Sequence, residues 1–224
     1  VKPGKKLDAV SARQLYSAVG QAKLINRYFE LFREHKIACG QVLTTKENFG
    51  SRTHYLNQKH CMEVMLDNKV IPIVNENDTI SVTELMFTDN DELSGLIATM
   101  MGMDALIILS NIDGIYNGNP ADPTATVIRE IDGGKQDLSE YVQTSKSSFG
   151  RGGVLTKCTI AQKVADEGIT VIIANGKKEN ILPALLAKGS QTVCTRFIPA
   201  AKPVSSVKKW IAHSEGFAKG EIHI

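Results

Sequence analysis

Two clusters of acidic and amide side chains constrain this chain most strongly, because each borders an apolar segment with the pattern of regular structure. The first polar cluster, residues 75–78 (NEND), directly follows VIPIV at 70–74, an apolar run typical of a buried strand. The second polar cluster, residues 88–91 (TDND), opens an apolar helical pattern. The segment between them alternates partly, with apolar residues at Ile80, Val82, Leu85 and Phe87. This pattern predicts a hairpin arm that brings both clusters together at the carboxyl end of a strand, where open α/β sheets bind ligands.

Each cluster also has a plain structural explanation. Asn and Asp are the commonest residues in turns and at helix N-caps, so Asn90 or Asp91 would cap the helix that follows. Glu92 would favour the first turn of that helix through the helix dipole. Two such clusters at the ends of one hairpin are harder to explain by capping alone, and they form our first candidate site.

Composition excludes several classes of partner. The chain has 224 residues, of which 42% are hydrophobic and 22% charged, and this is enough to bury a substantial core. Its net charge of +2 is too small to imply nucleic acid or a membrane surface as a partner. No apolar run approaches the length of a membrane span. From the small net charge and the lack of such a run, we expect neither a nucleic-acid nor a membrane partner.

The cysteines and histidines form no recognisable ligand motif. The four cysteines, Cys39, Cys61, Cys158 and Cys194, are widely separated, and no Cys-x-x-Cys pair occurs. The five histidines are equally scattered. The sequence therefore predicts no metal site, and it favours reduced thiols in a cytoplasmic protein.

Helical and strand patterns alternate along the chain. The periodicity predicts helices at residues 11–36, 52–68, 91–103, 155–167 and 180–188. It predicts strands at residues 41–45, 70–74, 105–110, 127–131, 170–174 and 192–198, with another from 208 onward. The run ALIILS at 105–110 is typical of a parallel strand buried on both faces. This alternation indicates an α/β fold with a parallel sheet.

A glycine-rich segment at residues 150–157, GRGGVLTK, is the second chemical element. It lacks the glycine spacing and the Gly-Lys-Ser/Thr ending of a P-loop. Closely spaced glycines still let backbone N–H groups approach a phosphate, and Arg151 or Lys157 would supply positive charge. Glycine-rich loops are also common as connectors, but the position before a helix favours anion binding.

Taken together, residues 75–98, 105–120 and 150–157 resemble the glutamate 5-kinase branch of the amino-acid kinase family. Residues 17–25 and 208–222 also resemble it, so the similarity covers nearly the whole chain in order. The resemblance implies a three-layer α/β/α sandwich with a mostly parallel central sheet. It also implies transfer of the γ-phosphoryl group of ATP, with Mg²⁺, to the side-chain carboxylate of glutamate, the first step towards proline.

The resemblance assigns roles to particular residues. Asp78 falls at the family's glutamate-contacting acid, which can pair with the substrate's ammonium group, and Asn90 falls at an amide that also contacts glutamate. Lys157 is the expected catalytic residue, which neutralises charge on the transferred phosphoryl group. The implied ATP-binding residues are Ser110, Asn111, Arg151, Gly152, Gly153, Val154, Leu155, Thr156 and Lys157. A carboxylate with a pKa near about 4 is already ionised at neutral pH, so this reaction needs no general base.

The sequence departs from the family pattern in several places. A lysine-glycine phosphate loop and a serine-glycine loop normally precede the region that this chain covers. We therefore expect residues 1–224 to be an amino-acid kinase domain that lacks its N-terminal strands and the RNA-binding-like domain that often follows, within a longer protein. Arg151, Val154 and Asn111 stand where the family usually has threonine, methionine and aspartate.

Two alternatives remain open at this point. One is a sister kinase acting on aspartate, N-acetylglutamate or a nucleoside monophosphate. The other is a non-catalytic module that binds glutamate or proline but no nucleotide. The resemblance further implies feedback inhibition by proline and a homo-oligomer, either a dimer or a tetramer.

Overall fold

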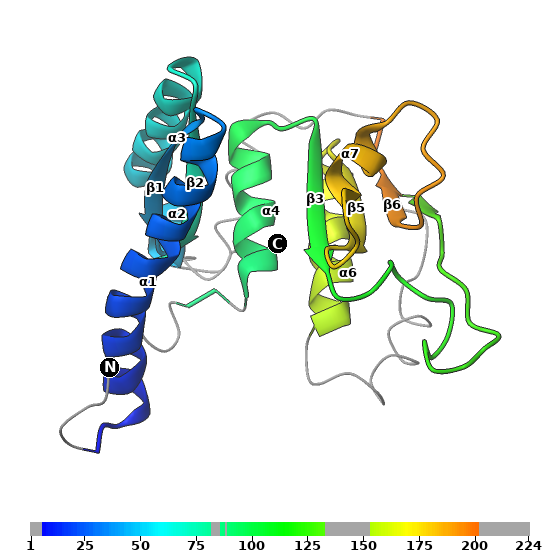
Figure 1. Ribbon diagram of the computed structural model, residues 1–224, viewed down its shortest axis with the longest axis horizontal. Coiled ribbons are helices and arrows are strands. Elements are labelled where there is room, and N and C mark those ends of the chain that lie inside the picture. The colour runs from blue at the N-terminus through cyan, green and yellow to red at the C-terminus, as the bar shows by residue number, and fades with distance from the viewer. Residues whose placement is uncertain (1–5, 82–85, 88, 133–152, 202–224) are drawn as a thin grey trace, which may run out of the picture. The chain divides into compact units, whose positions relative to one another are not determined.

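The computed structural model describes residues 6–81, 86–87, 89–132 and 153–201 (Figure 1). The described residues divide into two compact units, one up to Leu93 and one from Ser94 onward. The boundary lies within helix α4 (Asn90–Met101). Each unit has its own sheet and its own helices, and each is described separately below.

The first unit is built on a pair of parallel strands. Its elements are α1 (Ala9–Glu34), β1 (Ala38–Thr44), α2 (Lys46–Gly50), α3 (Arg52–Asp67) and β2 (Val70–Glu76). The register runs from Ala38 opposite Val70 to Thr44 opposite Glu76. Helix α1 packs against β1 and helix α3 against β2. Parallel pairing places the carboxyl ends of both strands side by side.

Local sequence signals set the ends of the two long helices. The Asp8 carboxylate caps α1 by accepting hydrogen bonds from Val10 N and Ser11 N, both at 3.0 Å. The Ser51 side chain caps the start of α3. Lys36 and Lys69 follow the two helices with φ of 57° and 60°, the left-handed conformation that lets the chain leave a helix and enter a strand.

The second unit contains a four-stranded sheet. Besides the rest of α4, its elements are β3 (Ala105–Ser110), β4 (Glu130–Asp132), α6 (Gly153–Asp166), β5 (Thr170–Asn175), α7 (Ile181–Leu186) and β6 (Thr195–Ile198). The strand order is β3-β5-β6-β4. β3 pairs with β5 and β4 with β6 in parallel, whereas β5 and β6 are antiparallel. The sheets of this chain are therefore mostly parallel.

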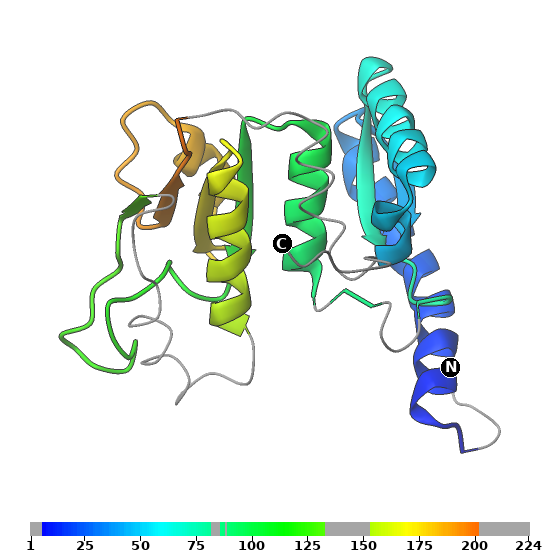
Figure 2. The same ribbon diagram turned by 180° about the vertical axis from the view of Figure 1, so that it is seen from behind.

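Strand β5 forms the centre of the second unit, because its two faces enter two different hydrophobic clusters. Val171 and Ile173 pack in a cluster with residues of α6, and Ile172 and Ala174 in another with residues of α7. Helix α7 covers the side of the sheet nearer the viewer in Figure 1, and α6 covers the side nearer the viewer in Figure 2. The second unit therefore has three α/β/α layers.

The α/β fold with mostly parallel strands is confirmed, with corrections in detail. The prediction that residues 105–110 are buried on both faces is wrong for β3, which lies at one end of the described sheet with Leu109 43% exposed. Strand β5 has that burial instead. The short helix α2 was not predicted. The predicted strand from residue 208 onward lies outside the described residues.

The predicted hairpin arm after β2 is not a strand where the chain is described. Residues 78–80 form a turn, and Ile80 is 65% exposed. Val82 and Leu85 lie outside the described residues. Phe87, at the far end of this segment, is 3% exposed and packs edge-on against Phe49 with 5.8 Å between ring centroids. Burial of Phe87 therefore anchors the returning chain.

Close contact between α4 and α6 requires a glycine at position 95. A Cβ atom there would lie 2.8 Å from Ile160 Cγ2 and 3.1 Å from Val164 Cγ2. Both contacts come from β-branched side chains, which cannot rotate away freely.

We expect Gly95→Ala to lower the free energy of unfolding by about 1 to 2 kcal/mol, because overpacking outweighs the gain in helix propensity. Chemical denaturation measures this. The matched control is Gly20→Ala in α1, where no atom lies within 4 Å of the added Cβ. That change should raise stability by about 0.5 to 1 kcal/mol. Equal effects of the two substitutions would contradict the close contact.

Candidate active site

The first polar cluster lies directly after β2, beside the end of β1. Asp78 is half-buried in the turn that follows the strand. Asn77 N donates a hydrogen bond to Thr44 O at 2.7 Å, which ties this turn to the end of β1. The Thr79 hydroxyl donates to Asn77 Oδ1 at 2.5 Å. The turn that carries Asp78 is thus held both by the sheet and by its own side chains.

The end of β1 is itself a buried polar network. Thr44 is 1% exposed and donates from Oγ1 to Gln58 Oε1 at 2.7 Å. The Asn48 side chain accepts a hydrogen bond from Thr45 N at 2.8 Å, at the start of α2. Buried polar groups of this kind cost free energy unless they are paired, so the network favours one arrangement of the strand end.

The chain returns to the same place before the second polar cluster. Phe87 N donates a hydrogen bond to the carboxylate of Glu76 at 3.2 Å, and Glu76 is 9% exposed. Glu76 is the last residue of β2 and belongs to the first cluster. The chain just before the second polar cluster therefore returns to the carboxyl end of β2, beside the first cluster.

The start of α4 differs from the prediction. Asp89 provides the cap, because its Oδ1 accepts hydrogen bonds from Asp91 N at 3.0 Å and Glu92 N at 3.1 Å. The prediction of Asn90 or Asp91 as the cap was wrong, since the helix begins at Asn90, at least one residue earlier than that assignment requires. Asn90 is the first residue of the helix and is exposed.

Helix α4 is also anchored by an ion pair. Lys46 Nζ lies 2.8 Å from Glu92 Oε1, and the two side chains are 32% and 19% exposed. Lys46 is the first residue of α2, directly after the end of β1. The ion pair thus links the start of α4 to the end of β1, the same location as the turn that carries Asp78.

In the second unit, the predicted nucleotide residues Ser110 and Asn111 lie at the carboxyl end of β3. Ser110 is half-buried and Asn111 exposed, and Ser110 O accepts a hydrogen bond from Gly176 N at 2.8 Å. A Cβ atom at position 176 would lie 3.1 Å from Leu109 Cβ. The backbones that follow β3 and β5 therefore approach closely here.

A charged group not foreseen from the sequence lies beside these residues. Asp113 Oδ1 accepts a hydrogen bond from Asn175 Nδ2 at 2.9 Å and pairs with Lys178 Nζ at 2.8 Å. Hydrogen bonding to Lys178, and then to Asn175, holds the pKa of the Asp113 carboxyl below its usual range. The carboxylate joins the loops that follow β3 and β5.

The glycine-rich segment enters α6 earlier than predicted. The helix begins at Gly153, so Val154, Thr156 and Lys157 lie in its first turns and are half-buried. Val154 packs against the hydrophobic cluster of this unit. Arg151, Gly152 and the side chain of Leu155 lie outside the described residues. The N-terminus of α6 presents backbone N–H groups and a positive dipole end next to Lys157.

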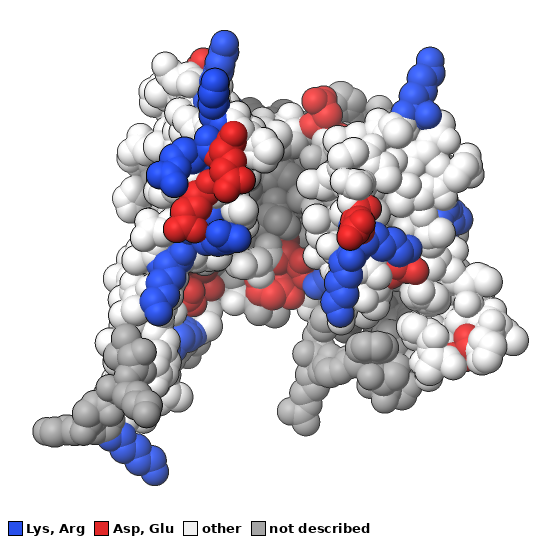
Figure 3. Space-filling view, in the orientation of Figure 1, with Lys and Arg blue, Asp and Glu red and all other residues white. Residues whose placement is uncertain are grey.

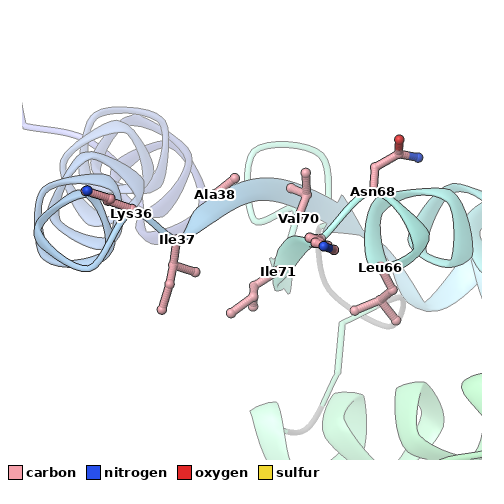
Figure 4. Close-up of a pocket in the computed structure, with 8 residues that line it drawn as sticks. Lys36, Ile37, Ala38, Leu66, Asn68, Val70 and Ile71 are labelled. Carbon is pink, nitrogen blue, oxygen red and sulfur yellow. The ribbon is translucent and has the colours of Figure 1, made fainter.

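A separate cavity of about 550 Å³ lies at the opposite ends of β1 and β2. The side chains of Ile37 and Ile71 extend to one side of these strands and Val70 to the other (Figure 4). This cavity is at the amino ends of the strands, whereas Asp78 follows a carboxyl end. It therefore does not belong to the candidate site.

Positive and negative side chains are mixed on the surface of the described residues. On the described part of the face in Figure 3, Lys and Arg side chains lie among Asp and Glu side chains. Lys59 and Glu63 form an ion pair along α3. Within residues 6–81, 86–87, 89–132 and 153–201, no helix has both the length and the apolar character to cross a membrane. The same residues contain no group of three or more His, Cys, Asp or Glu side chains placed to hold a metal ion.

Polar residues at the carboxyl ends of parallel strands, and a helix that begins at a glycine, are features that α/β proteins commonly use to bind ligands and phosphate groups. The model of the amino acid kinase family matches residues 2–175, and the chain belongs to this family. It is 77% identical to the glutamate 5-kinase of Bacteroides thetaiotaomicron, over all of this chain and 62% of that protein. It is 51% identical to the glutamate 5-kinase of Chlorobaculum tepidum, over 97% of this chain and 59% of that protein.

The chain thus spans about three-fifths of the length of these curated relatives. Among solved structures it resembles carbamate kinase from Giardia lamblia bound to AMP-PNP, with a TM-score of 0.60 and 17% identity. The similarity covers 89% of this chain and 75% of the other. At this identity the likeness supports the fold.

Sequence reasoning missed several residues that hold the candidate site. Glu76 and Asp89 were read only as members of polar clusters, although each accepts backbone hydrogen bonds that shape the site. Asp113 was passed over, although an Asp-Gly pair after a buried strand is a turn signal at the ligand-binding edge of a sheet. Lys46 had no local signal, because its partner Glu92 is far away in the sequence.

From the Asp113–Lys178 pair we expect a contribution to the free energy of unfolding that depends on pH. A lowered pKa in the folded state stabilises the protein above the ordinary carboxyl pKa of about 3.9, and this stabilisation disappears as the pH falls through the folded-state pKa. The side chains of Lys178 and Asp113 are 41% and 30% exposed, so solvent screens the pair.

We expect Asp113→Asn to lower the free energy of unfolding by less than about 1 kcal/mol at pH 7. The difference from the parent protein should vanish at acid pH, where the parent carboxylate is protonated. Denaturant titrations at both pH values measure this. Lys178→Met is the matched variant, and a double variant with the summed loss of both single variants would rule out direct pairing.

Proposed function

We propose that this chain is the amino-acid kinase domain of a glutamate 5-kinase, which transfers the γ-phosphoryl group of ATP to the side-chain carboxylate of L-glutamate. The observation that carries the proposal is the hydrogen bond from Phe87 N to Glu76, which brings the chain just before the second polar cluster to the carboxyl end of β2. Asp78 and Asn90 come from these clusters. The similarity to two glutamate 5-kinases supports the choice of substrate.

On the acceptor side, we assign recognition of the amino acid to Asp78 and Asn90. A carboxylate at position 78 would pair with the ammonium group of glutamate, and the Asn90 amide would donate to a carboxylate oxygen. The glutamate side chain is an ionised nucleophile at neutral pH, so orientation rather than deprotonation is what the protein must supply.

On the nucleotide side, we assign ATP binding to Ser110, Asn111 and residues 151–157. The N-terminus of α6 would face the phosphates with its N–H groups, and Lys157 in its first turns would offset the negative charge that develops on the transferred group. Phosphoryl transfer depends mainly on this kind of positioning and charge stabilisation.

We also infer that ATP acts as its Mg²⁺ complex. Mg²⁺ is usually held by substrate phosphates, water and one or two carboxylates, so it does not require a protein cage of three or more ligands. The ion would offset repulsion between the two anionic substrates.

Three further properties belong to the proposal. Reduced, unpaired Cys39, Cys61, Cys158 and Cys194 fit a cytoplasmic location. A homo-oligomer, dimer or tetramer, would cover apolar side chains that α1 exposes, including Tyr16, Leu24 and Phe29 at 44% to 48% exposure. Proline, an amino acid with the same α-carboxylate and ammonium groups as glutamate, is the proposed feedback inhibitor.

A hydroxylamine trapping assay tests the reaction directly. With ATP and Mg²⁺, glutamate should give a hydroxamate, because hydroxylamine captures an acyl phosphate. Aspartate and N-acetylglutamate are the parallel substrates. A product with one of these alone would indicate a sister kinase, and glutamate binding without nucleotide binding would indicate a non-catalytic module.

Lys157→Met tests the charge assigned to α6. We expect kcat to fall about 100- to 1000-fold with a nearly unchanged KM for glutamate, since the charge acts mainly on the transition state. Lys163→Met, an exposed position later on the same helix, is the control and should leave kcat unchanged. Equal losses from both variants would place the effect in the stability of α6 rather than in catalysis.

A further inference from the structure

Helix α1 reaches the candidate acceptor site through two adjacent side chains. The Gln14 amide donates from Nε2 to Thr79 O at 2.8 Å. The Arg13 guanidinium donates from one terminal nitrogen to Ser81 O and from the other to Met86 Sδ. The turn that carries Asp78 is therefore held from outside the sheet as well as from the ends of β1 and β2.

The two acceptors of Arg13 lie on two different segments of the chain: Ser81 follows the first polar cluster and Met86 precedes the second. Ser81 ends the turn after Asp78, and Met86 directly precedes Phe87, whose N–H binds Glu76. One planar guanidinium thus connects the outgoing chain of the first polar cluster to the incoming chain of the second. A lysine has one ammonium group and no rigid fork, so it could not hold both acceptors with the same geometry.

Burial makes these contacts strong. Ser81 is 2% exposed and Met86 is half-buried, so water competes poorly for the guanidinium at the Ser81 acceptor. A hydrogen bond from a charged donor contributes more than a neutral one. Near the other end of α1, by contrast, Arg27 and Glu30 form a surface pair at 3.1 Å, and both side chains are more than half exposed.

We propose that Arg13 is a positioning residue for the acceptor substrate, which sets the separation between Asp78 and Asn90 by bridging Ser81 and Met86. This inference rests on the proposed function for its kinetic consequence only. The bridge is a property of the first unit alone, and every residue in it lies between Arg13 and Asn90. It should therefore affect binding of the amino acid and leave binding of ATP unchanged.

The test compares Arg13→Met with Arg13→Lys and the matched control Arg27→Met on the same helix. The first readout is amide hydrogen exchange at Ile80, Ser81 and Phe87, whose N–H groups bind Asn77 O, Asn77 O and the Glu76 carboxylate. We expect exchange at these amides to quicken about tenfold in Arg13→Met, less in Arg13→Lys, and not at all in Arg27→Met.

The second readout is steady-state kinetics. Arg13→Met should raise the KM for glutamate about tenfold or more, with kcat changed less than about twofold and the KM for ATP unchanged. Arg13→Lys should recover part of the loss. An equal rise in both KM values, or a fall in kcat alone, would overturn the proposal, because either result would indicate general disturbance of the fold.

The two readouts separate this inference from the proposed function. If the parent protein forms no glutamyl phosphate, the proposed function fails, but hydrogen exchange still decides whether Arg13 holds the two segments. If exchange at Ile80, Ser81 and Phe87 is unchanged in Arg13→Met, the bridge is disproved whatever the kinetics. Thermal melts of each variant identify any that fail to fold, and Arg13→Lys then carries the comparison.

Discussion

The parallel pairing of β1 with β2 is the constraint on which the candidate acceptor site depends. It places Thr44 opposite Glu76, so that two buried polar residues end adjacent strands at the same edge. Neither can be buried without partners, and each finds them in the chain that follows. Thr44 binds Gln58, and the Glu76 carboxylate accepts the Phe87 N–H. The course of the chain after β2 is thus determined by the need to pair polar groups at the strand ends.

The second unit is held together mainly by apolar contacts. Strand β5 sends alternate side chains into two hydrophobic clusters, and the helices that supply those clusters lie on opposite faces of the sheet. At the carboxyl ends of β3 and β5 the packing gives way to polar contacts, in which Asp113 joins Asn175 and Lys178. In open α/β sheets ligands bind at the carboxyl ends of the strands, so these polar contacts lie at the edge where we propose that the nucleotide binds.

Much of the fold could be predicted because the decisive signals are local. Residues 105–110 and 170–174 are apolar runs of strand length, and both are strands in the structure. The helices after Asp8 and Ser51 begin at capping residues, which act within one turn of the chain. The cap of α4 was assigned wrongly within TDND, because several neighbouring Asp and Asn residues can all provide a cap and only the backbone path selects Asp89.

The sequence by itself determined the alternation of helices and strands, the location of the two polar clusters and the family to which the chain belongs. These follow from periodicity, residue type and order, which are properties of neighbouring positions. Only the tertiary structure decided that Arg13 contacts Ser81 and Met86, that Lys46 pairs with Glu92, and that β5 rather than β3 is buried on both faces. Such contacts join residues far apart in the chain, and their partners are selected by strand register and helix packing, which no local pattern records.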